Sequence, residues 1–160
     1  MKRLQTVCMI YQKPKVLLGL KKRGFGAGRW NGFGGKVEEG ETIEESVKRE
    51  TKEEAEIEVT DLEKIGIINF EFKNGANSLE VHFFKAENFK GVPTETEEMK
   101  PEWFLEKEIP FDQMWPDDKY WIPMFLAGKK FKGKFLFNQP STPELTSTIL
   151  KEELIEVEEI

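Results

Sequence analysis

The sequence predicts an α/β (α+β) fold in which a mixed β-sheet is flanked by helices as an α/β/α sandwich. Apolar stretches typical of strands lie on both sides of one central helical segment, and short turns join them as hairpins rather than as repeated βαβ units. The chain of 160 residues is long enough for one sizeable core and too short for two ordinary domains. We therefore expect residues 1–160 to form a single domain.

The N-terminal part predicts a hairpin followed by a long loop. Leu4–Tyr11 and Val16–Leu20 are apolar and are separated by a turn-like stretch that contains Pro14. The segment Arg23–Gly40 is rich in glycine and also holds aromatic residues, so we expect an ordered loop with room for one short strand. Loops of this length usually carry function.

The central helix is predicted over Ile43–Glu54. Thr42 and Glu45 have the spacing of a capping box, in which hydroxyl and carboxylate satisfy free N–H groups at a helix start. One row of side chains would face the core, although Thr51 places a hydroxyl in that row.

The second half of the chain predicts further strands and one more helix. Ile65–Phe72 and Leu79–Phe84 flank an Asn-Gly turn, which is typical of a hairpin. The remaining expected elements are a strand over Trp103–Leu105, a helix from Pro116 to Ala127 with proline in its first turn, and a strand over Lys129–Phe137. The acidic segment 143–160 is compatible with a strand or a helix.

Composition restricts the partners and the compartment. The formal net charge of -6 argues against binding to a nucleic acid polymer, and no stretch approaches the roughly 20 apolar residues that span a bilayer. Cys8 is the sole cysteine, which excludes an intramolecular disulfide and fits a reducing compartment. We expect a monomer in the cytoplasm, without membrane contact; nuclear and mitochondrial locations stay open.

The predicted helix concentrates acidic side chains on one patch. Glu50, Glu53 and Glu54 lie three and four residues apart, where each exposed like-charge pair costs about 0.2–0.5 kcal/mol. One interpretation is a solvated acidic face that neighbouring basic residues partly neutralise. The other is a site where Mg²⁺, bound by carboxylates, meets substrate phosphates beside the glycine-rich loop.

The segment 35–57 resembles the signature of the Nudix hydrolases, G-x5-E-x7-R-E-U-x-E-E-x-G-U, where U is aliphatic. The positions on pattern are Gly35, Glu41, Arg49, Glu50, Glu53, Glu54 and Ile57. Thr51 replaces an aliphatic residue, which should loosen packing below the helix. Glu56 replaces a glycine and would place a side chain in a left-handed or strained turn.

Three further blocks are similar to one branch of this family, the hydrolases of oxidised purine nucleoside triphosphates of the 8-oxo-dGTPase type. These blocks are Lys21–Val37, Glu97–Pro101 and Trp115–Asp118. The resemblance implies a Nudix fold and a Mg²⁺-dependent reaction that gives the nucleoside monophosphate and pyrophosphate, with 8-oxo-dGTP and 2-oxo-dATP among the substrates. The remaining alternative is a catalytically weakened domain that binds or senses nucleotides.

The resemblance also implies roles for individual residues. The metal-binding set is Gly34, Glu50, Glu53, Glu54 and Glu98, of which the three helix glutamates would also help to activate water. Arg49 would orient the neighbouring glutamates. The substrate-binding set is Thr6, Lys21, Phe25, Asn31, Phe70, Trp115, Asp117 and Asp118.

Two parts of the substrate-binding set carry specific expectations. Phe25 and Trp115 would sandwich the purine, because stacking gives affinity without reading the base edge. Asp117 and Asp118 are adjacent carboxyl groups, so burial would raise the pKa of at least one, and an exchange of the proton would admit either oxidised guanine or oxidised adenine. His82 and Cys8 are expected to be structural.

Overall fold

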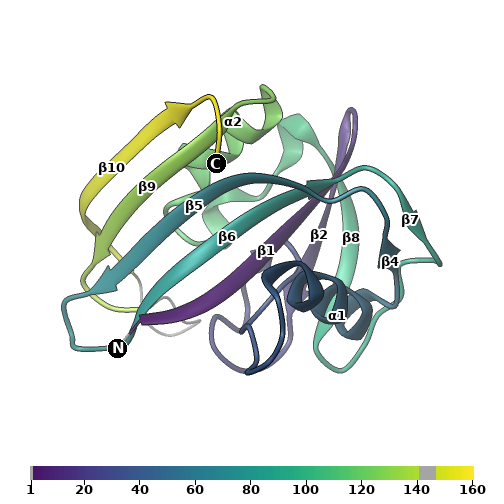
Figure 1. Ribbon diagram of the computed structural model, residues 1–160, viewed down its shortest axis with the longest axis horizontal. Helices are drawn as coiled ribbons and strands as arrows, with labels where there is room; N and C mark the ends of the chain where they lie inside the picture. The colour runs from purple at the N-terminus through teal and green to yellow at the C-terminus, as the bar shows by residue number, and fades with distance from the viewer. Residues whose placement is uncertain (1, 141–146) are drawn as a thin grey trace.

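A computed structural model of the protein describes residues 2–140 and 147–160. In this part of the chain, eight strands form one mixed sheet in the order β10-β9-β5-β6-β1-β2-β3, with β8 also paired to β2 (Figure 1). Its strands are β1 (Lys2–Gln12), β2 (Lys15–Lys21), β3 (Trp30–Asn31), β5 (Glu63–Phe72), β6 (Ser78–Ala86), β8 (Met99–Leu105), β9 (Lys130–Phe137) and β10 (Ile149–Val157). A separate small sheet pairs β4 (Glu58–Val59) with β7 (Phe89–Lys90).

Both predicted hairpins are confirmed. β1 pairs antiparallel with β2, and β5 pairs antiparallel with β6 across the loop that contains Gly75, whose φ of 88° lies in the region that glycine adopts readily. The sheet is mixed because β1 runs parallel to β6 and β5 runs parallel to β9.

The two helices cover opposite faces of the sheet, so the predicted sandwich is confirmed. Figure 1 shows α1 (Ile43–Ala55) in front of β1 and β2, and α2 (Asp118–Leu126) behind the sheet. Each helix packs on its own apolar cluster: Val47 and Ala55 join one with Phe84, whereas Trp121 and Phe125 join the other. Short 3₁₀ helices over Glu106–Glu108 and Phe111–Gln113 precede α2. Neither of the two α-helices among the described residues has the length and apolar character to cross a bilayer.

The helix α1 starts as the sequence predicts. The Thr42 side chain accepts from the Glu45 N–H, and the Glu45 carboxylate accepts from the Thr42 N–H. Thr51 is fully buried, and its hydroxyl donates to the Val47 carbonyl oxygen at 2.7 Å. The threonine therefore enters the core without leaving an unpaired hydroxyl, because its own helix supplies the acceptor.

The structure departs from the sequence prediction near α2 and leaves part of the C-terminal segment outside the description. α2 begins at Asp118, so Pro116 precedes the helix and does not lie in its first turn. The segment for which strand and helix stayed open forms the strand β10 over Ile149–Val157. Positions 143–146 of that segment lie outside the described residues.

Glu56 ends α1 in the left-handed conformation. Its φ is 59° and its ψ is 32°, and it is the one non-glycine residue of the described chain with a positive φ. This conformation is the strained turn expected where the signature has glycine. A Cβ atom makes it less favourable by roughly 1–2 kcal/mol than it is for glycine.

We expect Glu56→Gly to raise the free energy of unfolding by up to about 1 kcal/mol, because glycine relieves the left-handed strain but has more freedom in the unfolded chain. Denaturant unfolding of the two proteins measures the change. Glu56→Ala, which removes the carboxylate and keeps the Cβ atom, is the control. Equal stabilisation by alanine would mean that strain at Glu56 is not the cause.

Candidate active site

One cavity collects most of the predicted site residues. It lies between β1, β5, β6, the glycine-rich segment and the start of α2, and it reaches Glu54 of α1. Gly34 and Glu54 of the predicted metal-binding set line it. All eight predicted substrate-binding residues line it as well: Thr6, Lys21, Phe25, Asn31, Phe70, Trp115, Asp117 and Asp118. Four predicted residues, Arg49, Glu50, Glu53 and Glu98, are outside this lining. The cavity thus joins the predicted purine-binding groups to one end of the acidic helix.

The backbone at Gly34 and Gly35 passes between β1 and α1 with no space for side chains. A Cβ atom at Gly34 would lie 1.9 Å from the Thr6 carbonyl oxygen, and one at Gly35 would lie 2.8 Å from the Glu50 carboxyl carbon. Hydrogen bonds fix both sides: the Thr6 N–H donates to the Gly35 carbonyl at 2.9 Å, and the Gly34 N–H donates to Glu54 Oε1 at 2.9 Å. Glycine is required here by close approach of the backbone.

Arg49 links the glutamates of α1 to the preceding loop. Its Nε and Nη2 donate to the two carboxylate oxygens of Glu41 at 2.7 and 2.9 Å, a bidentate pair of the strong type. Its Nη1 donates to Glu50 at 2.9 Å and to Glu53 at 3.2 Å. One guanidinium therefore orients three carboxylates, which supports the predicted orienting role. The hydrogen bonds from Arg49 lower the pKa of Glu41 to about 2.

Glu54 is the most buried carboxylate of the acidic helix. Burial raises its pKa to about 8, and the nearby charges of Glu50 and Glu98 act in the same direction, whereas the Gly34 N–H and Lys21 oppose the shift. Burial also raises the pKa of Glu50, against the effect of Arg49. These carboxylates repel one another in a partly dehydrated place, so positive charge brought between them would be favourable.

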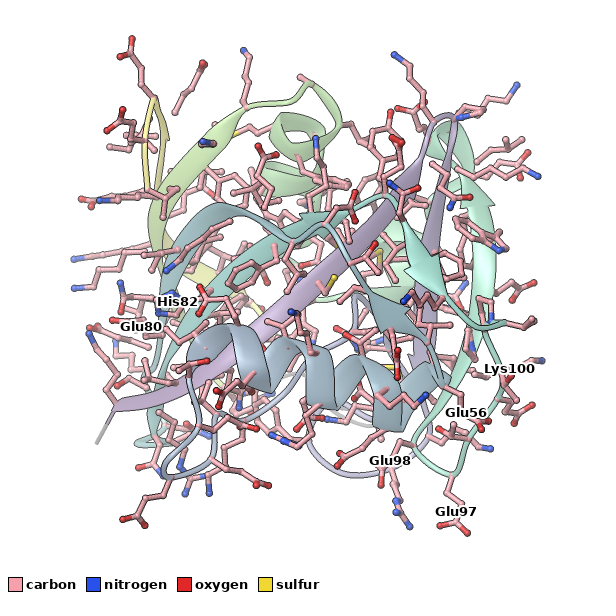
Figure 2. The ribbon with its side chains drawn as sticks, turned by 45° about the vertical axis from the view of Figure 1, so that its right-hand side comes forward. Glu56, Glu80, His82, Glu97, Glu98 and Lys100 are labelled. Carbon is pink, nitrogen blue, oxygen red and sulfur yellow. The ribbon has the colours of Figure 1, made fainter. Side chains whose placement is uncertain are left out.

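Glu98 reaches the same region from the loop before β8. Its carboxylate accepts from Arg23 Nε at 3.0 Å and also from Arg23 Nη2, and these bonds lower its pKa. Its charge contributes to the raised pKa of Glu54, although the two residues belong to different elements of the fold. Figure 2 shows Glu98 below the C-terminal part of α1.

The carboxylates of this acidic region have the chemistry to bind a divalent cation. Carboxylate oxygens are the ligands that hard cations prefer, and burial, which raises the pKa of Glu50 and Glu54, disfavours their charged forms until a cation is bound. Among the described residues, no three acidic, histidine or cysteine side chains are grouped closely enough to enclose a metal as they stand. Arg49 occupies Glu50 and Glu53 in this arrangement, and a cation would have to compete for them.

Asp117 and Asp118 form a buried acid pair at the other end of the cavity. Trp121 Nε1 donates to Asp117 Oδ2 and to Asp118 Oδ1, each at 3.0 Å, and the two carboxyl groups are hydrogen-bonded to each other. Asp117 stands at the N-cap position of α2 but makes no side-chain capping hydrogen bond. Burial raises the pKa of both, further for Asp118, which also meets the charge of Asp117. The coupled pair therefore keeps a proton to higher pH than a free aspartic acid does.

The aromatic residues of the cavity are arranged differently from the expected sandwich. The rings of Phe25 and Trp115 have centroids 5.3 Å apart and are inclined at 32°, so they touch each other. A base between them needs roughly 7 Å, twice a van der Waals contact. Phe25 is 48% exposed and has room to move, whereas Trp115 also packs edge-on against Phe137. Phe70 is a buried wall whose ring stacks beside those of Phe135 and Phe137, with centroids 5.8 and 6.0 Å away.

The remaining predicted residues lie where a ligand could meet them. Thr6 is buried beside Gly35, with its hydroxyl 3.4 Å from the Gly35 carbonyl and N–H. Asn31 uses its Nδ2 to donate to the Arg29 carbonyl at 3.2 Å, and Lys21 lines the cavity near Glu54.

The cavity is also lined by residues that were not predicted from the sequence. Those missed are Gln5, Val7, Gly32, Phe72, Leu79, Val81, Phe83, Met99 and Trp121. The alternation of Leu79, Val81 and Phe83 is a period-two signal for one face of a strand. Trp121 lies three and four residues after the acid pair on a predicted helix, a spacing that brings side chains together.

His82 and Cys8 lie outside the cavity lining. His82 is buried in β6 and its Nε2 is 2.8 Å from Glu80 (Figure 2). Cys8 is fully buried, and burial raises the pKa of its thiol to about 12, so the expected core position is confirmed.

Comparison with known proteins gives consistent similarities. Residues 1–125 match the family model described as NUDIX domain. The chain is 54% identical over 140 residues to an oxidized purine nucleoside triphosphate hydrolase from Mus musculus, with 88% of this chain and 90% of the relative covered. A protein of the same description from Danio rerio is 52% identical over 135 residues, covering 84% and 86%. A MutT protein structure from Bacillus halodurans superposes with a TM-score of 0.76 at 30% identity, covering 95% of this chain and 97% of that one.

We expect Asp118→Asn to stabilise the protein near neutral pH. A folded-state pKa above the ordinary value means that, once the pH exceeds about 3.8, the unfolded chain releases this proton more readily and stability falls as pH rises. The amide resembles the protonated acid and does not ionise, so the gain should grow from pH 4 to pH 7 and vanish below pH 4. Unfolding by denaturant across this range measures it. A lower free energy of unfolding for Asp118→Asn at pH 7 would show that burial of the ionisable pair does not destabilise the protein.

Proposed function

The chain belongs to the NUDIX family, and from this membership we propose that it hydrolyses oxidised purine nucleoside triphosphates with Mg²⁺ as cofactor. The substrates are 8-oxo-dGTP, 2-oxo-dATP and related nucleotides. The products are the nucleoside monophosphate and pyrophosphate. Removal of these nucleotides keeps damaged purines out of newly made DNA or RNA.

One observation supports this proposal above the others. A single cavity is lined by a buried acid pair at one place and by Glu54 with the Gly34–Gly35 backbone at another. The first can read the edge of a base, and the second belongs to the acidic helix suited to a cation and phosphates. The two relatives that share more than half of their aligned residues with this chain carry the description oxidized purine nucleoside triphosphate hydrolase.

The residues at the base end select the substrate. Asp117 and Asp118 present both a carboxylate that accepts and a carboxyl group that donates, and Trp121 orients the pair. Trp115 and Phe25 supply stacking surfaces once Phe25 moves from its contact with the indole. Asn31 adds a donor and an acceptor near the base edge.

The residues at the phosphate end prepare the hydrolysis. Glu50, Glu53, Glu54 and Glu98 are the oxygen ligands that would hold Mg²⁺. The bound cation neutralises charge on the triphosphate and lowers the pKa of water. Arg49 keeps the glutamates oriented, and the Gly34 N–H fixes the Glu54 carboxylate. Water attacks a phosphorus atom at the bridge between the α- and β-phosphates of the nucleotide, the P–O bond of that bridge breaks, and the nucleoside monophosphate and pyrophosphate separate as the water loses its proton.

A nucleotide sensor without catalysis is the weaker proposal. The feature that favours it is that Thr51 and Glu56 depart from the Nudix signature, which could weaken catalysis. The structure accommodates both, because the Thr51 hydroxyl is paired within α1 and Glu56 adopts the left-handed conformation that glycine would provide. The carboxylates of Glu50, Glu53 and Glu54 all lie on α1.

We expect metal-dependent hydrolysis to be faster for 8-oxo-dGTP and 2-oxo-dATP than for dGTP, and Glu54→Gln to lower kcat about 100-fold or more. The amide keeps the shape of the side chain but loses the charge that a cation needs. Steady-state release of pyrophosphate with and without Mg²⁺ is the measurement. Glu44→Gln, an exposed change on the same helix, should leave the rate unchanged. Tight nucleotide binding without turnover would favour the sensor.

We expect Asp117→Asn and Asp118→Asn to shift the preference between 8-oxo-dGTP and 2-oxo-dATP. An amide cannot change its protonation state, so it fixes one donor pattern, and the ratio of kcat/KM should move about 10-fold, as for one charged hydrogen bond. In the unsubstituted protein the same ratio should change with pH over the range in which the raised pKa values of the pair lie. A ratio that neither substitution alters would remove the acid pair from base selection.

A further inference from the structure

Thr96 uses its hydroxyl for every hydrogen bond that a hydroxyl can make. Oγ1 donates to the Glu54 backbone carbonyl at 3.0 Å, and it accepts from the backbone N–H groups of Glu98 and Met99, each at 3.2 Å. A hydroxyl has one hydrogen to donate and two lone pairs to accept, so its capacity is filled. This single group joins the main chain of Glu54 to the main chain of Glu98.

The loop around Thr96 also caps the C-terminal end of α1. The carbonyl groups in the last turn of a helix have no partner within the helix. The Thr94 N–H donates to the Ala55 carbonyl at 3.0 Å, and the Thr96 hydroxyl donates to the Glu54 carbonyl. Figure 2 shows Glu97 and Glu98 beside the end of α1, where Glu56 lies.

The other side of this loop is held by the start of the glycine-rich segment. Lys22 Nζ donates to the Thr96 carbonyl at 2.9 Å and to Glu95 at 2.7 Å, and the Lys22 N–H donates to the Glu98 carbonyl at 2.9 Å. The Thr96 N–H donates to the Met99 carbonyl at 2.9 Å. Thr96 therefore stands where α1, the loop that carries Glu98 and the glycine-rich segment meet.

We propose that Thr96 is a positioning residue for hydrolysis, which sets the place of the Glu98 carboxylate relative to Glu54. The inference rests on the proposed function, in which both carboxylates serve one cation. They come from different elements, so their separation depends on contacts between these elements. The Thr96 hydroxyl bridges the backbones of both residues and fixes that separation. Groups that orient metal ligands from behind typically matter about 10- to 100-fold for metal affinity or activity.

The test compares Thr96→Val, which has the same shape without the hydroxyl, with Thr96→Ser, which keeps it. Thr94→Val is the matched control, because that hydroxyl donates at 2.7 Å to the Val92 carbonyl inside the same loop. Two quantities are measured: the affinity for Mn²⁺ without nucleotide, from the electron paramagnetic resonance of the free ion, and kcat and KM for 8-oxo-dGTP with Mg²⁺. Thr96→Ala repeats the test should valine prevent folding.

We expect Thr96→Val to lower Mn²⁺ affinity and kcat about 10-fold while KM changes little, and Thr96→Ser and Thr94→Val to stay close to the unsubstituted protein. In the Glu98→Gln background, Thr96→Val should add no further loss, because it acts through Glu98. Equal effects of both valine substitutions, unchanged Mn²⁺ affinity, or independent losses in the double variant would overturn the proposal. Absence of hydrolysis by the unsubstituted protein would contradict the proposed function instead, and the Mn²⁺ comparison would still decide the role of Thr96.

Discussion

The close passage of the Gly34–Gly35 backbone between β1 and α1 is the constraint on which the rest of the site depends. The Gly35 carbonyl accepts from the Thr6 N–H of β1, and the Gly34 N–H donates to Glu54 of α1, so this stretch of backbone holds the sheet and the helix at a separation that leaves no room for side chains. A larger residue at either position would meet the Thr6 carbonyl or the Glu50 carboxylate. Because the glycines lie in the lining of the cavity, the same constraint brings Glu54 of the acidic helix into the cavity that also contains the acid pair.

The site concentrates unfavourable electrostatics at two places and compensates each differently. Arg49 of α1 divides its donors among Glu41, Glu50 and Glu53, whereas Glu54 accepts from the Gly34 N–H and keeps a raised pKa despite the nearby charge of Lys21. At the acid pair, the Trp121 indole N–H donates to both carboxyl groups, and burial raises the pKa of each. Strained groups of this kind are typical of functional sites, since the interactions that a ligand will supply are missing in its absence.

Much of the fold could be predicted because its signals are local. The Thr42–Glu45 capping box, the Asn-Gly turn and the alternating apolar strands each depend on a few neighbouring residues, and the structure contains the elements that they predict. Less could be predicted where an element depends on distant partners. The strand β10 reads as strand or helix in isolation and becomes a strand by pairing with β9. In the same way, Pro116 is compatible with a first helical turn, but α2 begins only at Asp118, after Asp117, whose carboxylate accepts from the Trp121 indole N–H.

The sequence by itself determined the chemical groups of the site and their local order: the spacing of the glutamates on α1, the glycines before it, and the adjacent acids before Trp121. These follow from helix periodicity and from residue type, which need no knowledge of distant contacts. Only the tertiary structure decided that ten of the predicted residues share one cavity, that Phe25 rests on Trp115, and that Thr96 joins Glu54 to Glu98. Such pairings depend on the order and register of the strands, and a side chain's nearest neighbours in space come from segments dozens of residues away in the chain.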